Sequence, residues 1–234
     1  MMPKFWVDNK EIEAQPGATV LQACLDHDIY IPNLCYLEGI DPPSVSCRMC
    51  FVEIEGHRQP VPSCSVLVED GMVVRTDTPA VRQLQRTGLG LLLSVHHVDC
   101  KNCRANKKCE LQRIAKFLKV GLKPKGLERH LRELEIDRSH PFLDYYPNRC
   151  VLCGKCIHVC RKKNGQSALT FSKRGFDTVI SFYGVTNLST LECENCNACI
   201  DICPVGALVL KESKKEDPKE SVPNLRKSEE PNTA

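Results

Sequence analysis

The sequence predicts a multidomain α+β protein. Three observations support this prediction. Residues 1–78 combine short strand patterns with one helical pattern, residues 79–120 carry apolar stripes at helical spacing, and residues 140–210 hold two similar cysteine blocks around a strand pair. The chain has 234 residues, of which 42% are hydrophobic and 26% charged. This composition is typical of globular proteins and excludes a wholly disordered chain.

The first predicted domain, residues 1–78, combines a hairpin, a helix and later strands. Its helix begins after Thr19, which can cap it, and runs through Val20, Leu21, Cys24 and Leu25. Cys24 falls on the apolar face of this helix, so we expect it to be a core residue. The strand patterns lie at residues 4–7, 11–14, 51–55 and 72–75. This order of elements predicts a β-grasp domain.

Residues 79–120 are predicted to be a helical domain. Thr78 is a suitable N-cap, and Pro79 suits the first helical position. A second helix is expected over residues 110–120, with Gly121 at its C-cap. Leucines at 127, 131 and 134 predict a short third helix in a linker over residues 121–139.

Residues 140–210 form the third predicted domain. Strand patterns at 168–171 and 178–181 flank Lys173, Arg174 and Gly175, which predicts a hairpin. Residues 211–234 are rich in charge, Pro and Ser. We expect this tail to be disordered because it has little apolar surface to bury.

The chain contains 16 cysteines, an unusually large number. No secretory signal or membrane span is visible in the sequence, so we expect a cytoplasmic protein without a membrane span of its own. Thiols stay reduced in that compartment, which argues against disulfides. The tight C-x-x-C groups favour metal centres instead.

The charge distribution could suggest a nucleic-acid partner, but we reject this interpretation. Residues 101–139 carry 12 basic and 5 acidic side chains, a balance that can indicate nucleic-acid binding. Thiolate-bound clusters are anionic, however, and nearby Lys and Arg side chains would offset them. We therefore expect no nucleic-acid partner.

The strongest motif is a pair of cysteine blocks typical of bacterial ferredoxins with two [4Fe–4S] clusters. Three cysteines of each block bind one cluster, and the fourth binds the cluster of the other block. Gly154 and Asn197 occupy matching positions and tolerate the left-handed backbone that such loops need. Arg161 replaces the proline of the motif without removing a ligand. The ligand sets are Cys150, Cys153, Cys156 and Cys203, and Cys193, Cys196, Cys199 and Cys160. The alternative is a pair of zinc sites.

Two further groups of cysteines have spacings that are compatible with more than one kind of metal centre. Four cysteines suit either a [2Fe–2S] cluster or a zinc site: Cys35, Cys47, Cys50 and Cys64. A third group, Cys100, Cys103 and Cys109, is one ligand short of a [4Fe–4S] cluster. His96 or His97 could complete it, or the group could be a zinc site with three cysteines and one histidine.

Taken together, the three constellations resemble a known family. They are similar to the N-terminal iron–sulfur region of the large G subunit of NADH:quinone oxidoreductase. They also resemble the diaphorase iron–sulfur subunits of NAD-linked bidirectional hydrogenases and the N-terminal part of [FeFe]-hydrogenases. The resemblance covers roughly residues 3–210. It implies [2Fe–2S] on Cys35, Cys47, Cys50 and Cys64, and a [4Fe–4S] cluster on His96, Cys100, Cys103 and Cys109. One departure is Val45, where the family commonly has glycine.

The resemblance implies an α+β arrangement of three units: a β-grasp [2Fe–2S] ferredoxin, a small helical His/Cys [4Fe–4S] domain and a bacterial ferredoxin-like domain with two [4Fe–4S] clusters. It implies an electron-transfer subunit that has no catalytic residues. Its partners would be a flavin subunit that oxidises NAD(P)H and a catalytic subunit such as a hydrogenase, a formate dehydrogenase or another reductase. The sequence shows no nucleotide-binding fingerprint of its own. The alternatives are a stand-alone soluble polyferredoxin and a zinc-stapled scaffold.

Overall fold

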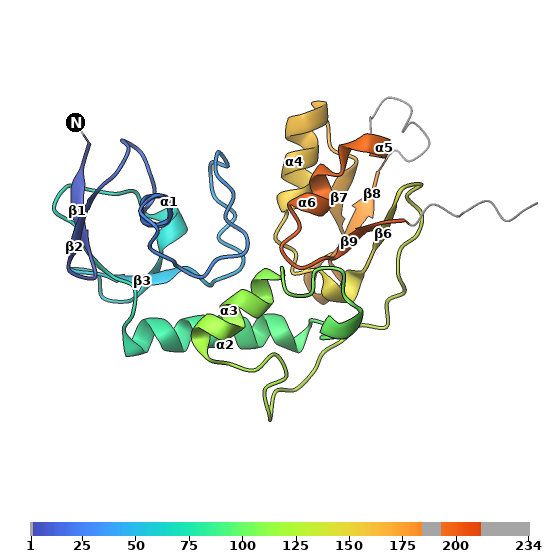
Figure 1. Cartoon of the computed structure of the whole chain (residues 1–234), viewed down its shortest axis with the longest axis horizontal. Coiled ribbons are helices and arrows are strands. Elements are labelled where there is room, and N and C mark those ends of the chain that lie inside the picture. The colour runs from blue at the N-terminus through green and yellow to red at the C-terminus, as the bar shows by residue number, and fades with distance from the viewer. Residues whose placement is uncertain (1, 184–192, 212–234) are drawn as a thin grey trace, which may run out of the picture.

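The computed structural model describes residues 2–183 and 193–211. Figure 1 shows a body of strands with one helix at the N-terminal side and a second body of short helices and strands at the C-terminal side. Two helices, α2 and α3, lie beneath both bodies. The mixed α and β composition predicted from the sequence is confirmed. No helix in the described ranges has both the length and the apolar character needed to cross a membrane.

The N-terminal body is a five-stranded mixed sheet with the order β2-β1-β5-β3-β4. Strands β1 and β5 are parallel, and the other neighbours are antiparallel. Helix α1 (Val20–Asp26) begins at Thr19, whose side chain accepts a hydrogen bond from the Gln22 amide at 3.2 Å. Cys24 is fully buried in this core, as predicted. The strands are β1 (Lys4–Val7), β2 (Lys10–Glu13), β3 (Phe51–Ile54), β4 (Val61–Pro62) and β5 (Val73–Arg75).

Helices α2 (Pro79–Ser94) and α3 (Glu110–Leu118) form the middle of the molecule. Thr78 caps α2 by accepting a hydrogen bond from the Val81 amide at 3.2 Å. The predicted C-cap of α3 was wrong. The helix ends at Lys119 in a left-handed conformation with φ of 55°, and the Lys119 and Val120 amides bond to Lys116 and Ala115. These two bonds satisfy carbonyls that a helix end leaves free, so the chain turns before reaching Gly121.

The predicted helix in the linker over residues 121–139 was also wrong, because this segment has no helix. Pro124 and Gly126 disfavour a helix at its start. Further on, the backbone bonds to other segments: the His130 amide donates to the Ser94 carbonyl at 2.8 Å, and Asp137 pairs with Tyr145 through two bonds of 2.9 Å. These tertiary hydrogen bonds replace the local ones that a helix would make.

The C-terminal body contains two small antiparallel sheets, β6–β9 and β7–β8. The β7–β8 pair is the hairpin predicted from the sequence. The tail prediction falls on residues 211–234, of which all but residue 211 lie outside the described ranges. The elements here are β6 (Leu143–Tyr145), α4 (Lys155–Asn164), β7 (Leu169–Ser172), β8 (Val179–Phe182), α5 (Cys193–Cys196), α6 (Ala198–Asp201) and β9 (Leu208–Leu210).

A single apolar cluster connects the three parts of the chain. Leu34 and Met49 of the first part pack into the same core as Leu89 of α2, Ile114 of α3 and Val205 near the C-terminus. Burial of shared apolar surface stabilises the parts against one another. Cysteines of the first and third parts, Cys35, Cys47, Cys156 and Cys160, belong to this shared core.

Candidate iron–sulfur centres

The first cysteine group lies on loops around β3 and β4. The four residues Cys35, Cys47, Cys50 and Cys64 are each at most 7% exposed. A hydrogen bond from Cys47 lowers the pKa of Cys35 to about 5 and raises that of Cys47. Cys64 likewise lowers the pKa of Cys50, while its own pKa is raised by that bond and further by the charges of the other cysteines. The structure therefore brings all four thiols together, out of contact with water.

Backbone geometry supports a tight binding loop here. The Leu34 amide donates to Cys47 Sγ at 3.4 Å, which is the kind of bond that stabilises a thiolate ligand. Arg48 and Val45 have φ of 53° and 47°. The left-handed conformation is costly for a β-branched side chain. Val45 thus adopts a backbone conformation that glycine would supply without strain.

Helix α2 contacts this loop closely at Gly88. A Cβ atom at residue 88 would lie 2.8 Å from the Arg48 carbonyl oxygen and 3.2 Å from Met49 Sδ. The neighbouring Gly90, on the same helix, has no atom within 4 Å of the corresponding position. Gly88 therefore allows α2 to support the loop that carries Cys47 and Cys50.

Replacing Gly88 with alanine should destabilise the protein and weaken the first centre. Overpacking costs about 1–3 kcal/mol, which exceeds the ~1 kcal/mol that alanine gains over glycine in a helix. Gly90→Ala is the matched control and should be neutral or stabilising. Denaturant unfolding and the visible circular dichroism of the metal centre reconstituted on these four cysteines measure the two effects. Equal behaviour of the two variants would show that the contact with Arg48 is unimportant.

The second group surrounds the start of α3. Cys100 begins a 3-10 turn, η2 (Cys100–Asn102), and Cys109 is the residue before α3. Burial raises the pKa of Cys109, and the charges of Cys103 and Cys100 add to this shift. The three thiols are therefore close enough to interact.

The two candidate histidines differ in their surroundings. Burial lowers the pKa of His96 to about 4, so its ring is neutral at physiological pH, as a metal ligand must be. His96 Nδ1 is buried and has no hydrogen-bond partner among the described residues. His97 is exposed. A neutral, buried and unpartnered nitrogen four residues before Cys100 in the chain has the chemistry of a metal ligand.

The second group lies directly against the C-terminal body. Cys103 Sγ is 3.9 Å from the Val205 carbonyl oxygen, and the Glu110 amide donates to the Pro204 carbonyl at 2.9 Å. A Cβ atom at Gly206 would lie 2.8 Å from Ala105 Cβ. The loop of Cys103 and the loop after Cys203 are therefore neighbours. Any metal centres held by these two loops would lie close together.

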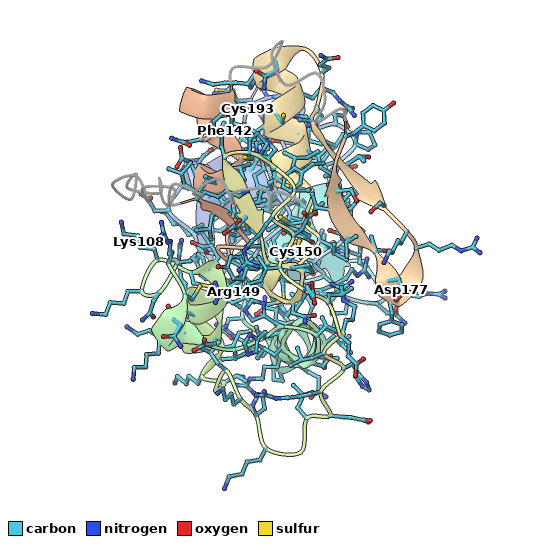
Figure 2. All side chains as sticks on the ribbon, turned by 90° about the vertical axis from the view of Figure 1, so that its right-hand side faces the viewer. Lys108, Phe142, Arg149, Cys150, Asp177 and Cys193 are labelled. Atoms are coloured by element: carbon cyan, nitrogen blue, oxygen red, sulfur yellow. The ribbon has the colours of Figure 1, made fainter. Side chains whose placement is uncertain are left out.

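The two ferredoxin-type blocks line two separate cavities. One is lined by Cys150, Cys153, Cys156 and Cys203, and the other by Cys160, Cys193, Cys196 and Cys199. The fourth cysteine of each block thus faces the other block's first three. Figure 2 shows Cys193 toward the upper end of the molecule and Cys150 nearer its middle.

Backbone features position these cysteines as the motif requires. Gly154 (φ 75°) precedes α4 and Asn197 (φ 48°) precedes α6, both in the left-handed conformation predicted for them. Among the described residues, backbone amides donate to sulfur atoms of these two blocks: Leu152 to Cys150 at 3.4 Å, Ala168 to Cys160 at 3.4 Å and Ala207 to Cys203 at 3.3 Å. These bonds would stabilise thiolates bound to a cluster.

Burial raises the pKa of thiols in both cavities. It raises those of Cys153 and Cys199 to about 12. These thiols would give up their protons only on binding metal. No group of three or more His, Cys, Asp or Glu side chains in the described ranges is arranged to hold one metal ion. Assignment to clusters instead of single ions therefore rests on the motifs and on the family.

The structure adds two residues that sequence reasoning missed. Arg149 is 8% exposed, stacks over the Tyr146 ring at 4.3 Å and donates to the Asn102 carbonyl at 3.4 Å. It is a buried cation next to Cys150 in the chain. Tyr145 is 1% exposed and lines the cavity of Cys150. Both residues lie within five positions of Cys150 in the sequence, and this was the one signal that could have pointed to them. The sequence does not show that their side chains are buried or which residues they contact.

Family models match three segments of the chain. A 2Fe-2S iron-sulfur cluster binding domain matches residues 2–79. The NADH-ubiquinone oxidoreductase-G iron-sulfur binding region matches residues 85–122, and the ferredoxin-like domain of NADH-quinone oxidoreductase subunit 3 matches residues 140–209. These matches and the cysteine groups define the chain as an iron–sulfur protein.

Individual relatives narrow the class to a family. The NADH-quinone oxidoreductase G subunit 2 of Rhizobium meliloti is 36% identical over 89% of this chain, and the NADP-reducing hydrogenase subunit HndD of Solidesulfovibrio fructosivorans is 37% identical over 87%. The chain spans 24% and 35% of the lengths of these relatives. A chain of the NAD+-reducing [NiFe]-hydrogenase, solved in the H2-reduced state, has a TM-score of 0.78 and 30% identity, covering 92% of this chain and 90% of that one.

The chain belongs to the family of iron–sulfur proteins that includes the G subunits of NADH-quinone oxidoreductases and this hydrogenase chain. The resemblance to this family that the sequence motifs indicated is confirmed.

Proposed function

We propose that this chain relays electrons between a flavin subunit that oxidises NAD(P)H and a catalytic subunit such as a hydrogenase, a formate dehydrogenase or another reductase. The observation that carries the proposal is that fifteen of the 16 cysteines are buried or half-buried and that eight of them line two separate cavities, four to each. Relatives named as NADH-linked oxidoreductase and hydrogenase proteins support it.

The proposed cofactors are one [2Fe–2S] and three [4Fe–4S] clusters, which supply one-electron transfer when bound. The proposed ligand sets are Cys35, Cys47, Cys50 and Cys64; His96, Cys100, Cys103 and Cys109; Cys150, Cys153, Cys156 and Cys203; and Cys193, Cys196, Cys199 and Cys160. The polypeptide holds these groups at set positions, donates amide hydrogen bonds to their sulfurs and limits access of water.

We infer a β-grasp domain over residues 1–78, a helical domain over residues 79–120 and a ferredoxin-like domain over residues 140–210. The sheet order of the first part and the hairpin of the last support this division. The extended segment 121–139 would link the second and third domains. A cytoplasmic location suits a chain that needs many reduced thiols.

Two measurements on the natural protein test this function. The isolated chain, reconstituted anaerobically, should carry about fourteen iron atoms and a similar amount of sulfide. The tagged chain, purified anaerobically from its host, should be accompanied by a flavin protein, and NADH or NADPH should then reduce its clusters. The isolated chain should not be reduced by either nucleotide.

The outcomes separate the alternatives. Two or more zinc ions per chain with little sulfide would establish the zinc-stapled scaffold. A fully loaded chain that purifies alone and exchanges electrons only by collision would be a stand-alone polyferredoxin. Either result would overturn the proposed relay.

A further inference from the structure

Tyr145 is the polar side chain in the lining of the cavity that also contains Cys150, Cys153, Cys156 and Cys203. Among the described residues that line this cavity, it has the one side chain with an oxygen or nitrogen atom. It lies at the end of β6, where it pairs with Leu208 of β9, and it is 1% exposed. A buried hydroxyl that donates to no acceptor costs free energy. We therefore expect the Tyr145 hydroxyl both to accept and to donate hydrogen bonds.

The oxygen of Tyr145 accepts a hydrogen bond from the Ile180 amide of β8 at 3.2 Å. A phenol hydroxyl also has one proton to donate, and the described side chains that share the cavity with Tyr145 offer cysteine sulfurs, Cys150 Sγ among them, as acceptors. The Ile180 bond holds the oxygen in place and leaves the hydroxyl proton available to a cysteine sulfur of this cavity. This phenol stays neutral at physiological pH because an ordinary tyrosine loses its proton only near pH 10.

We propose that Tyr145 is a positioning residue that raises the reduction potential of the centre held by Cys150, by donating a hydrogen bond to its sulfur. The proposal rests on the cluster assignment made above. Reduction adds one electron and one negative charge to the centre, and a hydrogen-bond donor at a ligand sulfur stabilises the more negative state. The Tyr145 proton stays on its oxygen while the centre gains or loses that electron.

Redox titration followed by paramagnetic resonance tests the proposal. Tyr145→Phe removes the hydroxyl and keeps the ring. It should reduce the equilibrium constant for reduction of this one centre about tenfold, a shift of about 59 mV to lower potential for one electron. The centre is identified by comparison with Cys153→Ser. Tyr146→Phe is the matched control: its ring can still stack under Arg149 at 4.3 Å, and we expect no shift.

A second measurement guards against a Tyr145→Phe variant that fails to load its clusters. Incorporation of 3-fluorotyrosine into the unsubstituted protein makes every tyrosine a stronger donor and should raise the potential of the same centre. An unchanged potential in both experiments, with full iron and sulfide, would overturn the role of Tyr145. Absence of the cluster from the unsubstituted protein would instead overturn the cluster assignment.

Discussion

Replacing Cys160 with serine should remove the centre of the downstream block and leave the centre of its own block intact. In the structure, Cys160 lines the cavity of Cys193, Cys196 and Cys199. Burial raises the pKa of Cys193 and Cys199, and the charge of Cys160 raises both further. Loss of this ligand should therefore cost about four iron atoms from a site more than 30 residues away in sequence. Iron analysis and paramagnetic-resonance spectra measure the loss.

The reciprocal change provides the matched comparison. Cys203 lines the cavity of Cys150, Cys153 and Cys156. Burial raises the pKa of all three, and the charge of Cys203 adds to each shift. Cys203→Ser should therefore give the spectrum of Cys153→Ser, whereas Cys160→Ser should give that of Cys196→Ser. Cys24→Ala, which alters the one cysteine outside the four sets, should keep every cluster. If Cys160→Ser matched Cys153→Ser instead, the crossed assignment would be wrong.

His96→Ala should perturb one [4Fe–4S] centre and leave the other three clusters unchanged. The imidazole is mostly buried, stays neutral because burial lowers its pKa to about 4, and presents an unpartnered Nδ1. Removing it would leave only Cys100, Cys103 and Cys109 to hold the centre. Paramagnetic-resonance spectra should show the loss of one signal, and iron analysis should show up to about four fewer atoms.

His97→Ala is the control for this experiment. His97 is exposed and adjacent in sequence, so its loss should change neither the spectra nor the iron content. His96→Cys should retain a centre at a lower potential, because thiolate adds negative charge where a neutral imidazole stood. The reverse dependence, with loss on changing His97, would move the ligand to that residue.

Local patterns were readable from the sequence because they depend on neighbours in the chain. Thr78 and Pro79 define the start of α2, and alternation of apolar residues defines β3. Gly154 and Asn197 adopt the left-handed backbone that their loops require. Cysteines three residues apart converge on one point in a turn, so the candidate ligands could be named without a structure.

Other features depend on contacts between distant segments. Residues 121–139 have leucines at helical spacing, yet the segment is not helical and its backbone forms hydrogen bonds to Ser94, Tyr145 and Asn148. Lys119 ends α3 before Gly121 because its bonds to the preceding turn outweigh the cost of a left-handed lysine. In both cases a weak local preference was overridden by hydrogen bonds that no pattern of spacing encodes.

The sequence by itself determined the class of the protein, the ligand candidates and most of the helices and strands, since spacing and periodicity are local properties. Only the tertiary structure decided which histidine has a buried, unpartnered nitrogen, where Gly88 allows a helix to touch the loop of Cys47, and that Tyr145 lines the same cavity as Cys150. These arrangements arise where segments far apart in the chain share one interior, and burial, reach and hydrogen-bond direction exist only once those segments have packed together.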